Sequence, residues 1–318
     1  MNPINDILEA VKTRSNIKKV AVQLPEGLKH YAPEISAELK KAGYGCIISG
    51  DACWGACDLA LDALEDADIL VHVGHIPVTQ HKNVIYIPYL QDISLENLNA
   101  AVSVLSKYNS VGIVTTIQHA HQSQQMAEYL KTKGINAVVG KGSGRTPVDG
   151  QVLGCTYETA EKAKADAYLF VGTGVFHAIG VALAAKKPTF ALDPFGNGGV
   201  LEVSGDKLLR RRFVQIEKAK NAKNFGILLS SKSGQCRKEL AKRLVSLSEK
   251  TSLVLIREVS EMELRNLGFD AYVNTACPRL AVDDQSRFSV PVLSPAEFEI
   301  VLGLRDWEDY EIDEIKTT

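Results

Sequence analysis

The feature that most constrains the fold is a strand–helix–strand order that recurs three times along the 318 residues. The predicted strands are short, rich in β-branched residues and not alternating, which is typical of strands buried on both faces of a parallel sheet. Their alternation with helical patterns predicts βαβ units with right-handed crossovers. The repeat length, roughly 105 residues, is too long for a solenoid and predicts three small α/β domains of similar plan.

Each repeat contributes four expected strands and two expected helices. Strands are expected at Lys19–Leu24, Cys46–Ser49, Ile69–Val73, Val84–Ile87, Val111–Thr115, Ala137–Val139, Ala167–Val171, Thr189–Leu192, Phe225–Leu229, Ser252–Ile256, Ala271–Val273 and Val290–Leu293. Helices are expected at Ala32–Ala42, Leu59–Ala67, His121–Lys133, Thr156–Lys164, Arg237–Leu247 and Met262–Leu267, with a connecting helix at Asp206–Lys223 that carries Arg210–Arg212 on a solvated face. We expect domains at residues 1–105, 106–205 and 206–318, with the active site where the three meet, because ligands bind beyond the carboxyl ends of parallel strands.

The charge balance and hydropathy exclude several classes of function. Lys and Arg number 36 against 38 Asp and Glu, and this balance argues against direct binding of nucleic acid. No apolar run approaches the ~18 residues of a membrane span, and the N-terminus lacks the pattern of a secretory signal. We therefore expect a cytoplasmic protein with no membrane partner. In such a protein we expect the six cysteines to be buried, metal-binding or catalytic rather than disulfide-bonded.

Three cysteines fall one in each repeat, in a loop that follows a strand: Cys57, Cys155 and Cys277. Three converging thiolates can hold three irons of a 4Fe–4S cluster and leave the fourth iron open to a ligand. The alternative is three unrelated cysteines, because well-separated cysteines carry no local signature. Cys53 is a second candidate in the first repeat. Cys57 is preferred because a helix is expected to start there, and a helix N-terminus lowers the pKa of a thiol.

The remaining cysteines and the glycine-rich loops have less specific interpretations. Cys46 and Cys236 are expected to be packing residues, since free cysteine is often buried. Gly172 and Gly174 would let the backbone approach an anion before a helix, although their spacing is not that of a dinucleotide site. The segment Ser231–Gln235 offers hydroxyl and amide donors for a carboxylate or, equally, ordinary helix capping. The segment Gly140–Thr146 is expected to be a flexible loop.

Four motifs together resemble the archaeal radical 3-amino-3-carboxypropyl transferases of diphthamide biosynthesis. They are Gln23-Leu24-Pro25-Glu26-Gly27-Leu28, Gly50-Asp51 with Gly55-Ala56-Cys57-Asp58, Gly154-Cys155, and Ala276-Cys277-Pro278-Arg279-Leu280. The resemblance extends over nearly the whole chain. It implies that Cys57, Cys155 and Cys277 are the catalytic residues and bind a 4Fe–4S cluster.

The resemblance also implies a reaction and its partners. The reduced cluster would cleave the bond between sulfur and the γ-carbon of S-adenosylmethionine, which releases methylthioadenosine. The 3-amino-3-carboxypropyl group would be added to C2 of a histidine of translation elongation factor 2, in the first step of diphthamide biosynthesis. An electron donor and a second copy of the chain, in a homodimer, are the other implied partners.

Contacts to S-adenosylmethionine are expected from polar residues and glycines placed in the loops at strand ends. The candidates are Gln23, Glu26, Gly27, His75, Gly172, Gly174, His177, Asp193, Ser233, Gly234, Gln235 and Arg279. For His75 and His177 a structural role, as donor to a backbone carbonyl, is the competing interpretation.

Three other functions compete with this one. Quinolinate synthase also has three repeated α/β domains and a three-cysteine cluster, which it uses as a Lewis acid in a condensation and dehydration. A non-catalytic iron–sulfur partner subunit and a simple ligand-binding protein without iron are the others. The Cys277-Pro278-Arg279 and Gln23–Gly27 motifs favour the transferase.

Overall fold

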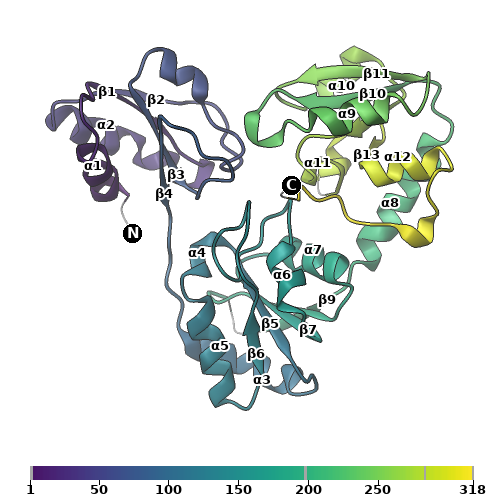
Figure 1. Ribbon diagram of the computed structural model, residues 1–318, viewed down its shortest axis with the longest axis horizontal. Helices are drawn as coiled ribbons and strands as arrows, with labels where there is room; N and C mark the ends of the chain where they lie inside the picture. The colour runs from purple at the N-terminus through teal and green to yellow at the C-terminus, as the bar shows by residue number, and fades with distance from the viewer. Residues whose placement is uncertain (1–2, 197–198, 283, 317–318) are drawn as a thin grey trace. The chain divides into compact units, whose positions relative to one another are not determined.

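Three sheets flanked by helices, distributed over two compact units, make up the computed structural model, which describes residues 3–196, 199–282 and 284–316 (Figure 1). The first unit contains the residues up to Asp92 together with Ile117–His121 and Lys232–Gly234. The second unit contains the other described residues and holds two of the sheets. The α/β class and the three sheets expected from the sequence are confirmed. The division into three domains at residues 105 and 205 remains a prediction.

The first unit contains a parallel sheet of strand order β2-β1-β3-β4. Its elements are α1 (Ile4–Lys12), β1 (Lys19–Gln23), α2 (Ala32–Lys41), β2 (Gly45–Ile48), β3 (Ile69–Gly74) and β4 (Val84–Pro88). Val20 and Val22 of β1 pack with Ile7 and Leu39 of the two helices, whereas Ala21 joins a smaller cluster on the other face. Burial on both faces explains why the β1 sequence does not alternate.

The first sheet of the second unit has five strands in the order β6-β5-β7-β8-β9. Its elements are α3 (Asn99–Leu105), β5 (Val111–Thr115), α4 (Ile117–Ala120, assigned to the first unit), α5 (Ser123–Thr132), β6 (Ala137–Val139), α6 (Glu158–Ala163), β7 (Ala167–Val171), α7 (Phe176–Ala185), β8 (Thr189–Leu192) and β9 (Val200–Val203). Ile113 packs on one face with Leu105 and Met126 of α3 and α5. Val114 points to the other face, where Val181 of α7 covers it.

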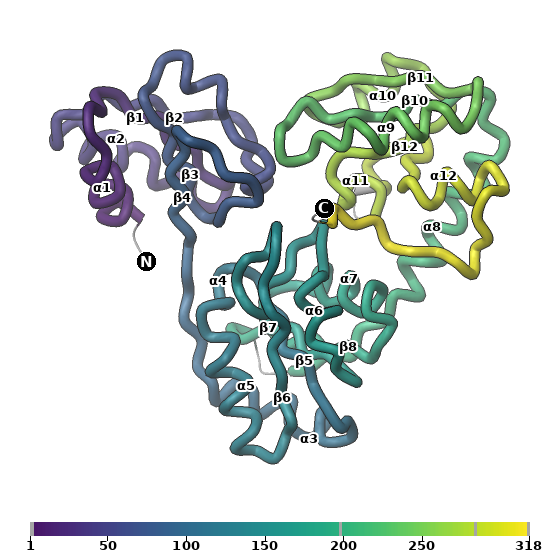
Figure 2. The backbone as a smooth tube through the Cα atoms, viewed as in Figure 1, coloured from purple at the N-terminus to yellow at the C-terminus, as the bar shows by residue number. Residues whose placement is uncertain are grey.

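The second sheet of this unit is parallel, with strand order β11-β10-β12-β13. Its elements are α8 (Asp206–Ala219), β10 (Phe225–Ser230), α9 (Lys238–Val245), β11 (Thr251–Ile256), α10 (Glu261–Leu267), β12 (Ala271–Asn274), α11 (Arg279–Val282), β13 (Val292–Leu293) and α12 (Pro295–Val301). The helix α8 connects the two sheets. Figure 2 follows the chain beyond α12 along the yellow C-terminal segment. No described helix is both long enough and apolar enough to cross a bilayer.

Arg212 of α8 is buried, whereas a solvated position was expected from the sequence. Its side chain is 1% exposed, and its Nε donates to Glu297 Oε1 of α12 at 2.7 Å. Its Nη2 donates to the carbonyl of Val292 at 2.8 Å. A buried charge needs such partners to offset the loss of hydration, and these partners are far away in the sequence. The run of three arginines in the sequence therefore predicted a solvent-exposed position for Arg212, and this prediction was wrong.

Every strand expected from the sequence is present, with small shifts of its ends. The unexpected strand is β9, which pairs antiparallel with β8 at the sheet edge and exposes Leu201 to solvent. The helices α1, α3 and α12 were not expected either. The helix expected at Leu59–Ala67 is a short 3₁₀ helix at Leu61–Glu65.

Candidate functional site

The three cysteines singled out from the sequence lie in loops, and all three are partly exposed. Cys57 follows β2 in the first unit, while Cys155 and Cys277 belong to the second unit. Cys277 follows β12, and the loop of Cys155 begins beside the end of β5, where Gln151 pairs with Thr115. Partial exposure leaves the three thiols accessible to a ligand, whereas a buried structural cysteine is inert.

The loop after Cys57 is held by the side chain of Gln23, which is 2% exposed at the end of β1. Gln23 Nε2 donates to the carbonyl of Asp58 at 2.8 Å, and Gln23 Oε1 accepts from the backbone N–H of Ala60 at 3.1 Å. Both bonds are with backbone groups, so they fix the orientation of the amide. Gln23 thus positions the loop that carries Cys57, and a direct contact to S-adenosylmethionine remains a prediction.

A buried ion pair also holds this loop. Lys232 Nζ lies 2.8 Å from Asp58 Oδ2, and each side chain is only 5% exposed. Two residues further on, a Cβ atom added at Gly234 would lie 2.4 Å from the Cα of Cys57. Gly234 and Cys57 both belong to the first unit. A side chain at position 234 would collide with the backbone of Cys57, which explains why this position requires glycine.

Two expectations about the cysteines were wrong. Cys57 lies in a turn closed by the bond from Asp58 N–H to the carbonyl of Gly55, and the next 3₁₀ helix begins only at Leu61. A helix N-terminus therefore does not act on its thiol. Cys236 was expected to be a packing residue but is exposed, whereas Cys46 is half-buried against the core of the first unit.

Cys155 is held by a basic side chain and by the C-terminal segment. Arg145 Nη2 lies 3.9 Å from Cys155 Sγ, and a guanidinium at this position favours the thiolate. The N–H of Ile315 donates to the carbonyl of Cys155 at 2.7 Å. Glu314 Oε2 accepts from the N–H of Tyr157 at 2.7 Å. Arg145 was not expected beside Cys155, because the glycine-rich segment around it is typical of a flexible loop.

Cys277 is held by Asn274, which is buried at the end of β12. Asn274 Nδ2 donates to the carbonyl of Cys277 at 2.8 Å, and its Oδ1 accepts from the N–H of Ala276 at 2.9 Å. Arg237 donates to the carbonyl of Thr275 at 2.9 Å and forms two bonds with the carboxylate of Asp313, at 2.6 and 2.7 Å. The C-terminal segment therefore holds the loops of both Cys155 and Cys277.

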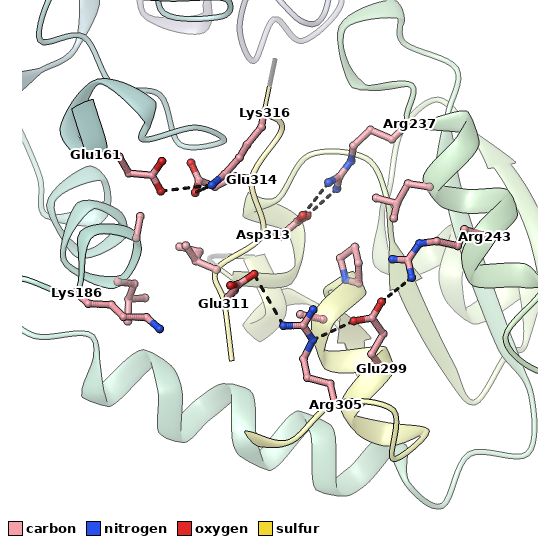
Figure 3. Close-up of a pocket in the computed structure, with 16 residues that line it drawn as sticks. Glu161, Lys186, Arg237, Arg243, Glu299, Arg305, Glu311, Asp313, Glu314 and Lys316 are labelled. Carbon is pink, nitrogen blue, oxygen red and sulfur yellow. Dashed lines mark hydrogen bonds and ion pairs between the residues drawn. The ribbon is translucent and has the colours of Figure 1, made fainter. Parts of the chain in front are cut away.

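Charged side chains from the C-terminal segment and the neighbouring helices surround a cavity of about 330 Å³ in the second unit (Figure 3). The cations and carboxylates around it are mostly paired with one another. Besides the Arg237–Asp313 pair, Glu299 accepts from Arg243 at 2.7 Å and from Arg305 at 3.0 Å. This pairing links the C-terminal segment to the two sheets of the second unit.

The neighbourhoods of Cys155 and Cys277 are also joined through Arg279. Its guanidinium lies over the ring of Phe176, 4.4 Å from the centroid. A Cβ atom added at Gly154 would lie 2.7 Å from the Phe176 ring and 3.1 Å from Arg279 Cδ. Burial raises the pKa of Tyr157, and the thiols of Cys155 and Cys277 raise it further. The second unit therefore brings two of the three cysteine loops into one neighbourhood.

The other candidates for S-adenosylmethionine contacts are spread over both units. Glu26 and Gly27 lie in a 3₁₀ helix after β1, where Glu26 pairs with Lys29 at 2.6 Å. Gly172 and Gly174 follow β7, and His177 of α7 stacks on Phe170. Asp193 follows β8 and accepts from the N–H of Phe195 at 3.0 Å. Ser233, Gly234 and Gln235 form a 3₁₀ turn after β10. Their roles remain predictions.

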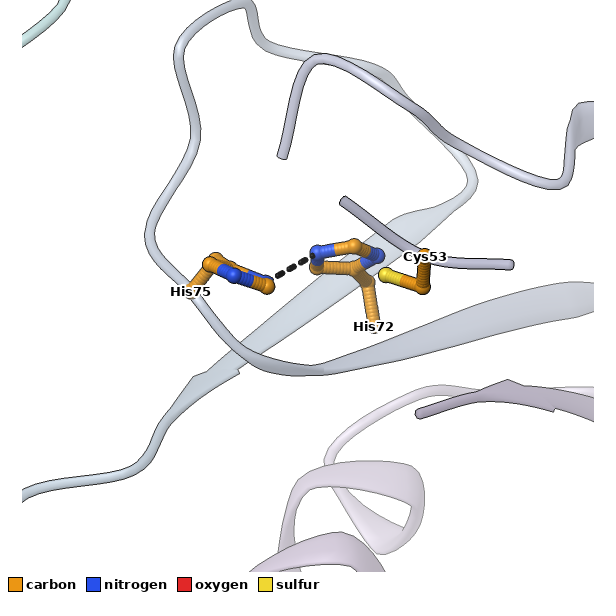
Figure 4. Close-up of side chains that lie close together, drawn as sticks. All are labelled: Cys53, His72 and His75. Atoms are coloured by element: carbon orange, nitrogen blue, oxygen red, sulfur yellow. Dashed lines mark hydrogen bonds between the residues drawn. The ribbon is translucent and has the colours of Figure 1, made fainter. Parts of the chain in front are cut away.

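His75 belongs to a buried polar group that the sequence did not reveal (Figure 4). His72 Nδ1 lies 2.9 Å from Gln23 Oε1, and His72 Nε2 lies 3.0 Å from His75 Nδ1. A ring nitrogen of each histidine and Sγ of Cys53 all lie within 4.8 Å of one another. Burial lowers the pKa of His72 to about 3 and that of His75 to about 4, and it raises the pKa of Cys53 to about 12.

The hydrogen bonds fix the tautomers of these neutral rings. An amide oxygen can only accept, so His72 Nδ1 carries the proton and donates to Gln23. His72 Nε2 is then the acceptor, and His75 Nδ1 donates to it. Spacing alone could have suggested the pair, because His72 lies in the buried strand β3 and His75 is the third residue after it.

The chain is similar to known proteins over nearly its whole length. Residues 24–312 match the family model described as "Putative diphthamide synthesis protein". The 2-(3-amino-3-carboxypropyl)histidine synthase of Pyrococcus horikoshii is 36% identical over 98% of this chain and 93% of its own length. The synthase of the same name from Methanocaldococcus jannaschii is 28% identical over 98% and 91%. The Schizosaccharomyces pombe protein named subunit 1 of this synthase is 30% identical over 93% and 72%.

The fold is also similar to that of a solved structure. The crystal structure of Dph2 from Pyrococcus horikoshii with a 4Fe–4S cluster superposes with a TM-score of 0.92, at 36% identity, over 99% of this chain and 94% of that one. Because the match extends over nearly the full length in both sequence and structure, the chain belongs to the family of diphthamide synthesis proteins.

Proposed function

We propose that this chain is a 2-(3-amino-3-carboxypropyl)histidine synthase that transfers the 3-amino-3-carboxypropyl group of S-adenosylmethionine to C2 of a histidine of translation elongation factor 2. The observation that carries the proposal is the near full-length similarity to the Pyrococcus synthase, in a chain that presents three partly exposed loop cysteines. The products would be the modified histidine, methylthioadenosine and one proton. The transfer would be the first step of diphthamide biosynthesis.

Cys57, Cys155 and Cys277 would hold a 4Fe–4S cluster, with one iron left open. The donor set suits the group, because three partly exposed cysteine thiols can each ligate one iron. Within four residues of Cys155 in the sequence, the buried atoms Thr156 Oγ1 and Gln151 Oε1 have no hydrogen-bond partner in the described part of the chain. When bound, the cluster would supply the electron that cleaves the bond between sulfur and the γ-carbon.

The protein residues would contribute positioning and charge. Arg145 beside Cys155 would stabilise the thiolate for iron. Arg279, held over the ring of Phe176, would offer a guanidinium to the carboxylate of S-adenosylmethionine, because this planar donor pairs with carboxylates in two parallel bonds. The orientation of S-adenosylmethionine decides which of its three carbon–sulfur bonds breaks. A fixed contact to its carboxylate would therefore select the bond that is cleaved, in addition to strengthening binding.

Three further features belong to the proposal. The chain would act as a homodimer, an electron donor would reduce the cluster, and the reaction would take place in the cytoplasm, where elongation factor 2 works. The elongation factor would reach the reacting group at the protein surface, since a histidine within a folded protein cannot enter a closed cavity.

The test starts from protein reconstituted anaerobically with iron and sulfide, reduced with dithionite and mixed with S-adenosylmethionine. Mass spectrometry then identifies the nucleoside. We expect methylthioadenosine rather than 5′-deoxyadenosine, its loss in Cys277→Ala, and its retention in the matched control Cys46→Ala. Added elongation factor 2 should gain the 3-amino-3-carboxypropyl group on one histidine.

A second function is favoured by the name of the Schizosaccharomyces relative, which is a subunit. If a cluster forms but S-adenosylmethionine stays intact, the chain would be an iron–sulfur partner subunit or a quinolinate-type dehydratase. Adding a second protein of the family would restore methylthioadenosine in the first case. Iminoaspartate and dihydroxyacetone phosphate would be consumed in the second.

A further inference from the structure

Cys53 lies close to two histidines, His72 and His75. Its side chain is buried in the first unit, and its Sγ lies within 4.8 Å of ring nitrogens of His72 and His75. Figure 4 shows the two imidazoles facing each other across their hydrogen bond, with Cys53 beside His72. Cys53 remains an alternative to Cys57 as a cluster ligand, and its immediate surroundings include two imidazoles.

We propose that Cys53, His72 and His75 form a site for a zinc ion that is separate from the three cysteine loops of the proposed cluster. One thiolate and two imidazoles are a ligand set that Zn²⁺ prefers, and three protein ligands leave one position for water or a small ligand. This inference does not rest on the proposed function. It assigns a second, non-redox metal to the chain.

The distances suit such an ion. Two nitrogens that each lie about 2.0–2.1 Å from a tetrahedral zinc are roughly 3.3 Å apart. The facing nitrogens of His72 and His75 are 3.0 Å apart, so a shift of a few tenths of an ångström makes room for the ion. The ion would replace the hydrogen that the two rings share.

The surroundings of the histidines suit a ligand role as well. Histidines that bind a metal usually donate their other N–H to an oxygen, which fixes the ring and its tautomer. His72 does this through Nδ1 and Gln23 Oε1 at 2.9 Å, so its Nε2 presents a lone pair. His75 would bind through Nδ1 once its proton has moved to Nε2. Both rings are neutral, and ligation therefore costs no imidazole proton.

The proton balance comes from the thiol. Cys53 is protonated in the metal-free protein, and its proton passes to solvent when the thiolate binds Zn²⁺. The uptake of one zinc ion therefore releases one proton. The ion would join the loop that precedes Cys57 to His72 of β3 and to His75, whereas Gln23 joins the residues that follow Cys57 to His72.

The test uses the full chain, stripped of metal under anaerobic reducing conditions and titrated with Zn²⁺ or with Co²⁺ as a coloured probe. We expect one equivalent to bind, a thiolate-to-cobalt absorption band, and an X-ray absorption spectrum of the zinc form with one sulfur and two imidazole nitrogens. Cys53→Ala and His75→Ala should weaken binding at least tenfold. Cys46→Ala and Cys57→Ala should bind like the unmodified chain.

The spectrum of the unmodified chain keeps the inference testable if a variant fails to fold. A zinc shell of three sulfurs would overturn it, since the ion would then sit on the loop cysteines. Binding that Cys53→Ala and His75→Ala leave unchanged would overturn it as well. The methylthioadenosine assay is independent, because Cys57→Ala should lose that product and keep the zinc ion. Failure of one proposal is thereby distinguished from failure of the other.

Discussion

The loop of Cys57 and the loops of Cys155 and Cys277 are held in different ways. In the first unit the loop depends on a buried amide, two neutral imidazoles and one ion pair whose side chains are 5% exposed. In the second unit the loops depend on the C-terminal segment, whose ion pair between Arg237 and Asp313 is 12% and 8% exposed. The more deeply buried arrangement tolerates less change, because a charge that loses its partner there cannot be hydrated.

The largest effect is expected from breaking the buried pair of the first unit. Lys232→Met leaves Asp58 buried without its cation, which costs about 3–5 kcal/mol of unfolding free energy. The matched control is Lys29→Met, which breaks the more exposed pair with Glu26 and should cost about 0–1 kcal/mol. Urea denaturation measures both. Equal losses in the two variants would show that the burial of Asp58 does not matter.

In the metal-free protein, the free energy of unfolding should decrease in acid because His75 becomes protonated. The pKa of His75 is lowered to about 4 in the folded chain, from 6.5, so the unfolded chain binds the proton first. Stability is complete above pH 6.5 and falls as the pH decreases toward 4, by about 2–3 kcal/mol for this ring. His75→Gln should flatten the pH dependence of the unfolding free energy between pH 6.5 and 4.5. The exposed His30→Gln is the control, and an unchanged slope in His75→Gln would contradict the prediction.

A smaller effect is expected when the C-terminal segment is loosened. Asp313→Asn removes the carboxylate that binds Arg237, and the pair is less buried than that of Lys232, so the expected loss is about 2 kcal/mol. If the proposed cluster is present, iron should also be lost faster to a chelator, because Arg237 holds the backbone before Cys277. Asp309→Asn, at an exposed position of the same segment, should change neither quantity. Loss of stability without faster loss of iron would mean that the C-terminal segment stabilises the fold but does not help to retain the cluster.

The smallest expected effect is a gain in unfolding free energy in the variant Glu314→Gln. Burial raises the pKa of Glu314, so its carboxylate is less favourable in the folded chain than in the unfolded one. The penalty is complete above the folded pKa and disappears as the pH falls below the unfolded value. Glu314→Gln keeps an oxygen for the N–H of Tyr157 and removes the charge. We expect a gain of less than about 1 kcal/mol at pH 7 that vanishes near pH 4, and a loss at pH 7 would mean that the ion pair with Lys316 outweighs burial.

Local sequence patterns predict most of the helices and strands. They also mark two helices, α1 and α12, that were not expected. Ile4, Ile7 and Val11 of α1 are spaced as one buried helical face, and Ser294-Pro295 followed by Glu297 is a capping box at the start of α12. Strand β9 is different, because its exposed Leu201 and Glu202 carry no pattern of burial. Its pairing with β8 exists only in the folded sheet.

For the candidate site, the sequence itself was sufficient to single out Cys57, Cys155 and Cys277 as candidates, since motif and position after a strand are local properties. The supports of these cysteines come from distant parts of the chain. Asp58 is paired with Lys232, Cys155 with Ile315, and Cys53 is beside His72 and His75. Hydrogen bonds and ion pairs act over a few ångströms, and only the tertiary structure decides which residues come that close. The sequence therefore determined the strands and the chemistry of the loops, and the folded chain decided what holds each loop in place.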